Sequence, residues 1–171
     1  MKHGWDDNEF PLAIFITFRT YGSWLPGDKR GSIDRYHNVF RGPRARPNSV
    51  FEKQNAGKLK SEPVVLNASQ RAIVRKAIRE VCKHRNWKIC VLNIRTNHVH
   101  LVVSIGTSDP EAALRDFKAY ATRALRKDGG WTNEHSPWVD GGSTRYLWNE
   151  RSVANACDYV VNRQGPDLSE F

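Results

Sequence analysis

The segment 97–105 constrains the fold more than any other part of the chain, because polar and apolar residues alternate along it. Val102 and two histidines, His98 and His100, occupy every second position. The positions between them are apolar: Val99, Leu101, Val103 and Ile105. Successive side chains of a strand point to opposite faces. The pattern therefore predicts a strand with one face on a core and both histidines on the other, open face.

The neighbouring segments predict a mixed fold. An apolar stretch at 87–95 precedes the histidine strand across a short turn, which indicates an antiparallel hairpin. One amphipathic helix begins at Asn67 with a capping box, and a second runs from about 109 to 127. A strand at 12–18 comes earlier, and 153–161 is a candidate third helix. We expect an α+β, ferredoxin-like antiparallel sheet with the helices packed on one face and the histidines on a central strand.

The chain length indicates one domain. Its 171 residues fall within the usual range for a single compact unit, so we assign 1–171 to one domain. Residues 26–63 are rich in Gly, Pro and basic side chains and show no regular periodicity. Such a long irregular stretch is typical of an insertion, so we expect a basic loop at about 26–63.

The charge balance points to a polyanionic partner. Lys and Arg number 27 and Asp and Glu number 18, which gives a net charge of +9. An excess of this size favours nucleic acid, although a basic surface can also serve solubility alone. No apolar run reaches the roughly 18–20 residues of a membrane span, so we expect no membrane partner. Three cysteines without paired spacing and the lack of an apolar leader favour the cytoplasm.

Basic and aromatic residues supply candidate nucleic-acid contacts. Basic side chains neutralise phosphates, and exposed indoles stack on unpaired bases, although burial of at least one indole is the simpler expectation. The candidates are Arg41, Arg44, Arg46, Arg123, Arg126, Lys127, Arg145, Trp138 and Trp148.

The histidine pair and one tyrosine are the candidates for chemistry. Two imidazoles on one face of a rigid strand can reach the same cation, although chance pairs of this kind without a role are common. Tyr120 lies at the border of the buried stripe of the second helix. A tyrosine at such a border is often only a packing residue with a solvated hydroxyl.

Together these features resemble a known family. Asn97-His98-Val99-His100-Leu101, followed by a helix with Lys118-Ala119-Tyr120, is similar to the HUH single-tyrosine transposases, and among them to the REP-associated tyrosine transposases. The early Ile16-Thr17-Phe18-Arg19 strand and the late stretches around 145–148 and 159–162 resemble the same group.

The resemblance implies metal-dependent nicking and strand transfer on single-stranded or hairpin DNA, by a monomer or a homodimer. His98 and His100 would hold Mg²⁺ or Mn²⁺, and Tyr120 would attack the phosphate to form a 5′-phosphotyrosine link. Relatives carry an amide ligand four residues after the tyrosine, where this chain has Ala124. Asp116, one turn before Tyr120, is the replacement we expect, with His135 or a water as alternatives.

Two other functions remain open from the sequence. The missing amide ligand is compatible with a domesticated, non-catalytic DNA- or RNA-binding protein on the same scaffold. A metal-dependent phosphoesterase of another class is disfavoured. A histidine-triad hydrolase needs a third His where Val102 stands, and separated His-x-Ser/Thr motifs are absent.

Overall fold

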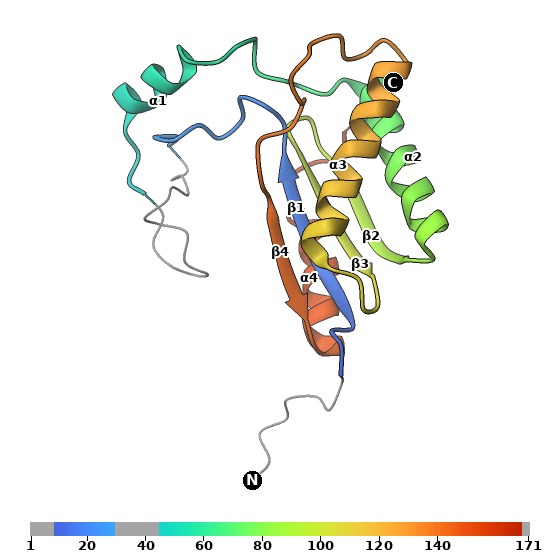
Figure 1. The fold of residues 1–171 in the computed structure, drawn as a ribbon. Coiled ribbons are helices and arrows are strands. Elements are labelled where there is room, and N and C mark those ends of the chain that lie inside the picture. Colours follow the sequence, from blue (N-terminus) through green and yellow to red (C-terminus); the bar gives the residue numbers. More distant parts are fainter. Residues whose placement is uncertain (1–8, 30–44, 169–171) are drawn as a thin grey trace. The chain divides into compact units, whose positions relative to one another are not determined.

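A four-stranded antiparallel sheet forms the centre of the fold in the computed structural model, which describes residues 9–29 and 45–168 (Figure 1). The strands lie in the order β2-β3-β1-β4. Their bounds are β1 (Ala13–Arg19), β2 (Lys88–Ile94), β3 (His98–Ser104) and β4 (Ser143–Leu147). The predicted α+β class is confirmed. Because β3 lies between β2 and β1, both histidines are on an inner strand.

Antiparallel pairing sets which side chains share each face of the sheet. Thr17 of β1 lies opposite His100, and Ile16 lies opposite Leu101. Strand β2 pairs with the other edge of β3, with a register shift between Ile89 and Val91. The register therefore places the β3 histidines in a row of side chains contributed by neighbouring strands.

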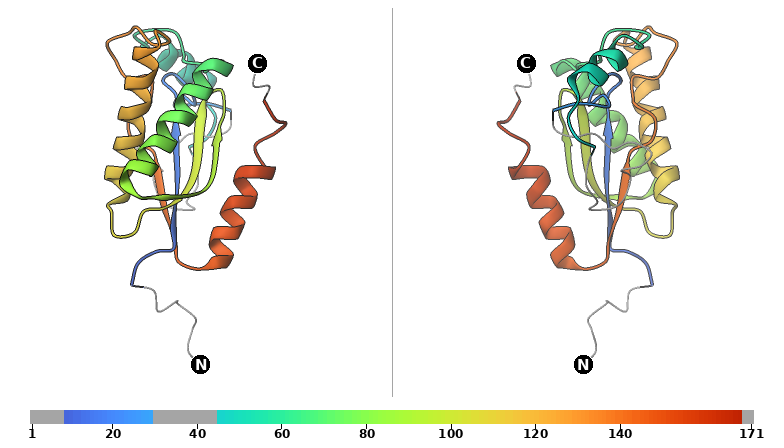
Figure 2. Two further views of the ribbon diagram at one scale, coloured as in Figure 1. Left: turned by 90° about the vertical axis from the view of Figure 1, so that its right-hand side faces the viewer. Right: turned by 90° about the vertical axis from the view of Figure 1, so that its left-hand side faces the viewer.

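Helices α2 (Ala68–Arg85) and α3 (Pro110–Lys127) cover one face of the sheet (Figure 2). The predicted capping box is present at the start of α2, where Asn67 and Gln70 exchange side-chain to backbone hydrogen bonds. Both helices turn apolar stripes toward the strands. Their fully or almost fully buried side chains include Val74, Ile78, Val81, Leu114, Phe117, Ala121 and Leu125.

Helix α4 (Glu150–Asn162) packs on the opposite face (Figure 2). The expectation that the helices pack on one face therefore holds for α2 and α3 but is wrong for α4. Ala156 and Val160 of this helix join Val102, Ala13 and Leu147 in a buried cluster. The physical reason is that α4 is amphipathic and must bury its stripe, while α2 and α3 already occupy the other face. The histidine face is therefore partly covered.

Residues 20–64 form a second compact unit, which overlaps the expected insertion. It contains a helix that the sequence did not predict, α1 (Ser49–Ala56), which buries none of its residues. Within this unit Gly27 adopts φ +97°, and a Cβ there would lie 2.5 Å from the carbonyl oxygen of Asn48. Across the described residues, no helix is long and apolar enough to cross a membrane.

Candidate active site

The two histidines form the centre of the candidate site. Their ring centroids lie 4.6 Å apart with an interplanar angle of 68°. His98 Nδ1 is 2.7 Å from Asn97 Oδ1, which orients the ring from its own strand end. His100 is almost fully buried, with 5% of its surface exposed. The strand thus presents one partly exposed and one buried imidazole side by side.

Burial keeps His100 uncharged at neutral pH. Desolvation, with a smaller contribution from neighbouring His98, lowers the pKa of His100 from 6.5 to about 4, against a hydrogen bond with Gln164 that raises it. Its Nδ1 lies 2.8 Å from Thr17 Oγ1 on β1. When Nδ1–H donates to that hydroxyl, Nε2 carries the free lone pair. This is the protonation state that a metal-binding histidine requires.

Gln164 brings an amide to the histidines from beyond the end of α4. Its Nε2 donates to the carbonyl oxygen of Tyr159 at 3.2 Å. That bond leaves the amide oxygen facing His98, and Oε1 lies 3.2 Å from His98 Nε2. The helix ends at Asn162, so the chain has already left helical geometry when it reaches this residue. An amide five residues after Tyr159 can therefore turn back to the sheet.

Tyr159 packs against the same pair of rings. Its centroid lies 5.6 Å from that of His100 and 5.9 Å from that of Phe15, both in edge-to-face geometry. The side chain remains 41% exposed, so solvent and a ligand can reach it. Phe15 of β1 supports both rings, since its centroid also lies 5.5 Å from His100. Helix α4 therefore places a phenol beside the imidazole pair.

A cationic side chain lies next to the aromatic residues that surround the histidines. Arg145 of β4 sits over the Phe15 ring, with its guanidinium carbon 5.6 Å from the centroid. A guanidinium here can engage phosphate oxygens with two parallel hydrogen bonds. Arg145, one of the predicted nucleic-acid contacts, is thus connected to the histidine site through their shared neighbour Phe15.

The donor set fits a divalent cation. Both ring nitrogens of His98 face an oxygen, and a neutral imidazole has only one N–H to share between them. Two ligands in adjacent positions of an octahedral site with bonds of about 2.1 Å stand about 3 Å apart. The 3.2 Å between His98 Nε2 and Gln164 Oε1 is compatible with that separation. His98, His100 and Gln164 are therefore the residues that could hold a metal. Among the described residues no cluster of three His, Cys, Asp or Glu side chains could do so.

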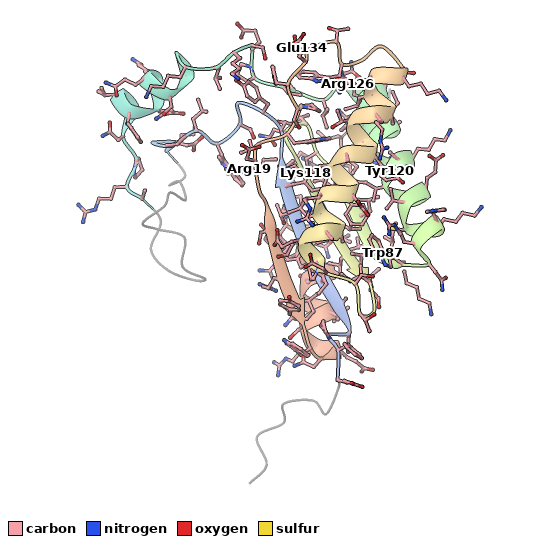
Figure 3. The ribbon with its side chains drawn as sticks, in the orientation of Figure 1. Arg19, Trp87, Lys118, Tyr120, Arg126 and Glu134 are labelled. Carbon is pink, nitrogen blue, oxygen red and sulfur yellow. The ribbon has the colours of Figure 1, made fainter. Side chains whose placement is uncertain are left out.

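The structure does not bring Tyr120 or Asp116 to this site. Both lie on α3, on the face of the sheet opposite α4 (Figures 2 and 3). The ring of Tyr120 contacts the guanidinium of Arg123 at 4.2 Å, and Asp116 pairs with Arg85 of α2 at 2.7 Å. Within one chain the sheet separates both side chains from the histidines, so neither Tyr120 nor Asp116 joins this site from its own subunit. Periodicity placed Tyr120 at the border of its helix, and side chains of that helix do not reach across the sheet.

The other basic residues predicted to contact nucleic acid differ in their exposure and in their hydrogen bonds. Arg41 and Arg44 lie outside the described residues. Arg46, Arg123 and Lys127 are exposed. Arg126 donates to the carbonyl oxygens of Asn133 and Glu134 and so holds the loop after α3 (Figure 3).

The two tryptophans behave differently. Trp138 is buried, with its ring 5.0 Å from Phe18, and its Nε1 donates to Thr122 Oγ1. It cannot stack on a base, so the prediction that it binds nucleic acid is wrong, and its role is in the core. Trp148 is 39% exposed and stacks on Tyr146 with the ring planes 22° apart.

The comparison with known protein families shows to which family the chain belongs. Residues 58–162, more than half of the chain, match the family described as transposase, IS200-like. The chain belongs to the IS200-like transposase family. The matched segment includes β3 and α4, and hence both histidines and Tyr159. The resemblance to tyrosine transposases drawn from the histidine motif is confirmed at the level of the family.

Two solved structures are similar to this IS200-like transposase, and the first of them supports its fold. A REP-associated tyrosine transposase, solved bound to a REP hairpin, aligns with a TM-score of 0.50 and 14% identity, covering 91% of this chain and 69% of its own. A Deinococcus radiodurans protein assigned as a transposase aligns with a TM-score of 0.47 and 12% identity, covering 97% and 100%. No curated protein sequence matches the chain.

The sequence analysis missed Tyr159 and Gln164 as site residues. The signal was present in the helix itself, because Val153, Ala156 and Val160 recur at helical spacing. A third amphipathic helix cannot share a face that two others fill, so it must cover the histidine face. That reasoning would have selected the tyrosine of the last helix over Tyr120.

Proposed function

We propose that this transposase cuts and rejoins DNA strands with Tyr159 as the nucleophile. One observation carries the proposal: Tyr159 packs on His100, while Gln164 contacts His98, on the same face of the sheet. A nucleophile and two imidazole ligands in one place are what phosphoryl transfer to a phenol requires. Tyr120, on the other face, has no such neighbours.

The cofactor of the proposed reaction is Mg²⁺ or Mn²⁺, bound by His98, His100 and Gln164. When bound, the ion supplies Lewis-acid polarisation of a phosphate oxygen. The protein residues do the remaining work. Thr17 and Asn97 orient the imidazoles from their Nδ1 sides, and the Tyr159 carbonyl orients the Gln164 amide. With Tyr159 as the nucleophile, the amide of Gln164, five residues further on, takes the place of the amide ligand that relatives carry four residues after the tyrosine.

In the proposed step the Tyr159 oxygen attacks the scissile phosphorus. A P–O bond to tyrosine forms and the P–O bond to the 3′ oxygen breaks. The phenol loses its proton, and the departing oxygen gains one to become a free 3′-OH. Attack by another 3′-OH on the phosphotyrosine reverses these changes, so the backbone is rejoined without an external energy source. Arg145 is placed to hold the non-bridging oxygens of the same phosphate.

The proposed substrate is single-stranded or hairpin DNA. The net charge of +9 favours a polyanion, and the solved REP-associated transposase of similar fold was bound to a hairpin. A flexible single strand can enter a site beside a helix more easily than a rigid duplex can. The partly exposed Tyr159 ring and the Arg145 guanidinium are the groups that such a strand would contact beside the histidines.

A covalent-adduct assay tests the proposal. Wild-type protein is incubated with single-stranded hairpin oligonucleotides and Mn²⁺, and protein–DNA adducts are resolved on denaturing gels. We expect Tyr159→Phe to abolish the adduct, because the ring remains but the attacking oxygen is lost. Tyr120→Phe is the matched control and should form the adduct at the wild-type level.

The opposite pattern, with loss only in Tyr120→Phe, would show that Tyr120 reaches the histidines of a second subunit. If neither wild type nor either variant forms an adduct while DNA binding is intact, the protein is a non-catalytic DNA-binding protein on this scaffold. Mapping the modified peptide by mass spectrometry distinguishes the two tyrosines directly, because they lie in different tryptic fragments.

A further inference from the structure

Asn93 of β2 links the sheet to the helix that carries Tyr159. Its Nδ2 donates a hydrogen bond to the carbonyl oxygen of Val160 at 3.0 Å. In the β2–β3 register Asn93 lies directly opposite His100, and residues directly opposite each other in an antiparallel pair share one face of the sheet. The amide therefore starts beside a histidine of the candidate site and reaches the residue that follows Tyr159.

The accepting carbonyl lies at the end of α4, where the helix itself provides no donor. The last four carbonyls of an α-helix have no partner inside the helix, and α4 ends at Asn162, so the carbonyl of Val160 belongs to this group. Val160 is fully buried, and a buried carbonyl without a donor destabilises the fold. Asn93 supplies that donor from the sheet. The bond therefore requires the end of α4 to lie at one position along β2.

Apolar packing does not define that position as closely. Val91, two residues before Asn93 on β2, packs against the buried cluster that contains Ala156 and Val160. Burial of apolar surface is non-directional, whereas a hydrogen bond weakens steeply as its angle bends. Asparagine is also depleted in strands, so the stability of β2 does not account for this residue. The place and the chemistry of Asn93 therefore fit a role in fixing the helix.

The bond fixes both side chains that this end of the chain brings to the histidines. Tyr159 directly precedes Val160, and its ring lies 5.6 Å from that of His100. Gln164 donates to the Tyr159 carbonyl, and its Oε1 lies 3.2 Å from His98 Nε2. A shift of the helix end would move the phenol and the amide together. A displacement of about 1 Å at a reacting group can lower a rate by about 100-fold.

We propose that Asn93 is a positioning residue for strand cleavage, which acts through α4 by holding Tyr159 and Gln164 against the histidine pair. The proposal rests on the proposed function, because it takes Tyr159 as the nucleophile. Asn93 contacts neither DNA nor the metal ion in this role. Its loss should slow the chemical step and leave the affinity for DNA unchanged.

Single-turnover formation of the protein–DNA adduct tests the proposal. Asn93→Leu has nearly the same shape as wild type but lacks the donor. At saturating hairpin DNA and Mn²⁺ we expect its rate constant to fall by about tenfold or more, with the Kd for the hairpin within about twofold of wild type. The amplitude should stay at the wild-type level. Partial unfolding would lower the amplitude and leave the rate constant, so the two effects are separable.

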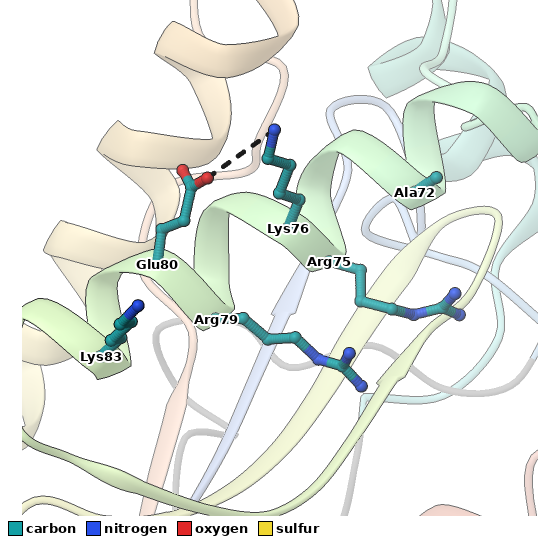
Figure 4. A pocket seen from close by; sticks show the side chains of 6 residues that line it. All are labelled: Ala72, Arg75, Lys76, Arg79, Glu80 and Lys83. Atoms are coloured by element: carbon teal, nitrogen blue, oxygen red, sulfur yellow. Dashed lines mark ion pairs between the residues drawn. The ribbon is translucent and has the colours of Figure 1, made fainter.

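Two controls lie on α2, which covers the other face of the sheet. Gln70→Met also removes an amide–carbonyl hydrogen bond, the one that Gln70 Nε2 donates to the Gly130 oxygen at 2.8 Å. Glu80→Gln breaks the exposed ion pair with Lys76 (Figure 4). Both should keep the wild-type rate constant. An unchanged rate constant in Asn93→Leu, or an equal fall in Gln70→Met, would overturn the proposal. Asn93→Val, which suits a strand, replaces Asn93→Leu if that variant unfolds.

Nuclear magnetic resonance of the histidine rings tests the same contact without any cleavage. The Tyr159 ring lies edge-to-face on His100, so its ring current shifts the His100 ring protons. We expect Asn93→Leu to change these shifts in the wild-type background and much less in a Tyr159→Leu background, because the effect passes through Tyr159. Equal changes in both backgrounds would overturn the proposal. Absence of an adduct in wild type would refute the proposed function, and the resonance measurement would still decide whether Asn93 positions Tyr159.

Discussion

Gln164 lies beyond the last residue of α4, and its side chain still contacts His98 of the candidate active site. Its amide is held at both ends, by the Tyr159 carbonyl on one side and by His98 on the other. The position four residues after Tyr159 is Arg163, whose backbone N–H caps the helix. The chain breaks from the helix at this point, and the next side chain turns back to the histidines. Gln164 is therefore the side chain that connects the end of α4 to β3.

Replacing Gln164 tests this connection. We expect Gln164→Ala to weaken Mn²⁺ binding by about tenfold or more, because one of three proposed ligands is lost. Gln164→Glu should bind at least as tightly as wild type, since hard cations prefer carboxylate oxygen. Isothermal titration calorimetry at neutral pH measures both. Asn162→Ala is the control, because that amide bonds to Asp158 instead. Equal Mn²⁺ affinity in Gln164→Ala and wild type would exclude the amide as a ligand.

At the scale of elements, α4 depends on its contact with the sheet. The helix is 13 residues long, and isolated helices of this length are marginal in water. Its N-terminus is capped by Asn149, whose side chain accepts a hydrogen bond from Ser152 N at 2.8 Å. The buried contacts of Ala156 and Val160 supply the remaining stabilisation. The position of Tyr159 therefore depends on the packing of the residues beside it.

Two adjacent valines of α4 allow a matched test. Val160 is fully buried and Val161 is 57% exposed. We expect Val160→Ala to lower the free energy of unfolding by about 1–3 kcal/mol, because two methyl groups leave a packed cluster. Val161→Ala should change it by less than about 0.5 kcal/mol. Urea denaturation followed by circular dichroism gives both values. Equal effects of the two substitutions would mean that α4 does not pack as described.

At the scale of the whole molecule, stability is expected to be uneven. Strands β1 and β3 are paired on both sides and have buried side chains on both faces. Helix α1, in the separate unit formed by residues 20–64, buries no residue. Local opening costs little where few apolar contacts must be broken. The sheet that carries the histidines should therefore be among the last parts of the chain to open.

Hydrogen exchange measured by mass spectrometry tests this ranking. We expect peptides from β1 and β3 to exchange most slowly and peptides from α1 to exchange within the earliest time points. Peptides from α4 should fall between them, since only one side of that helix is covered. Protection of α1 equal to that of β3 would contradict the ranking.

The sequence by itself determined most of the elements and the strand that carries the histidine pair. Alternation along 97–105 defined the strand and both of its faces, and the Asn67 capping box set the start of α2. These features are local, because side-chain direction in a strand and capping at a helix end depend on near neighbours. Helix α1 escaped prediction because its residues have no apolar stripe to reveal it.

Only the tertiary structure decided which tyrosine and which amide accompany the histidines. Tyr120 and Tyr159 both lie on amphipathic helices, and periodicity cannot show which face of a sheet a helix will cover. That choice follows from competition for apolar surface, since α2 and α3 fill one face and leave α4 to the other. Packing between segments distant in sequence therefore brought Tyr159 and Gln164 to His98 and His100.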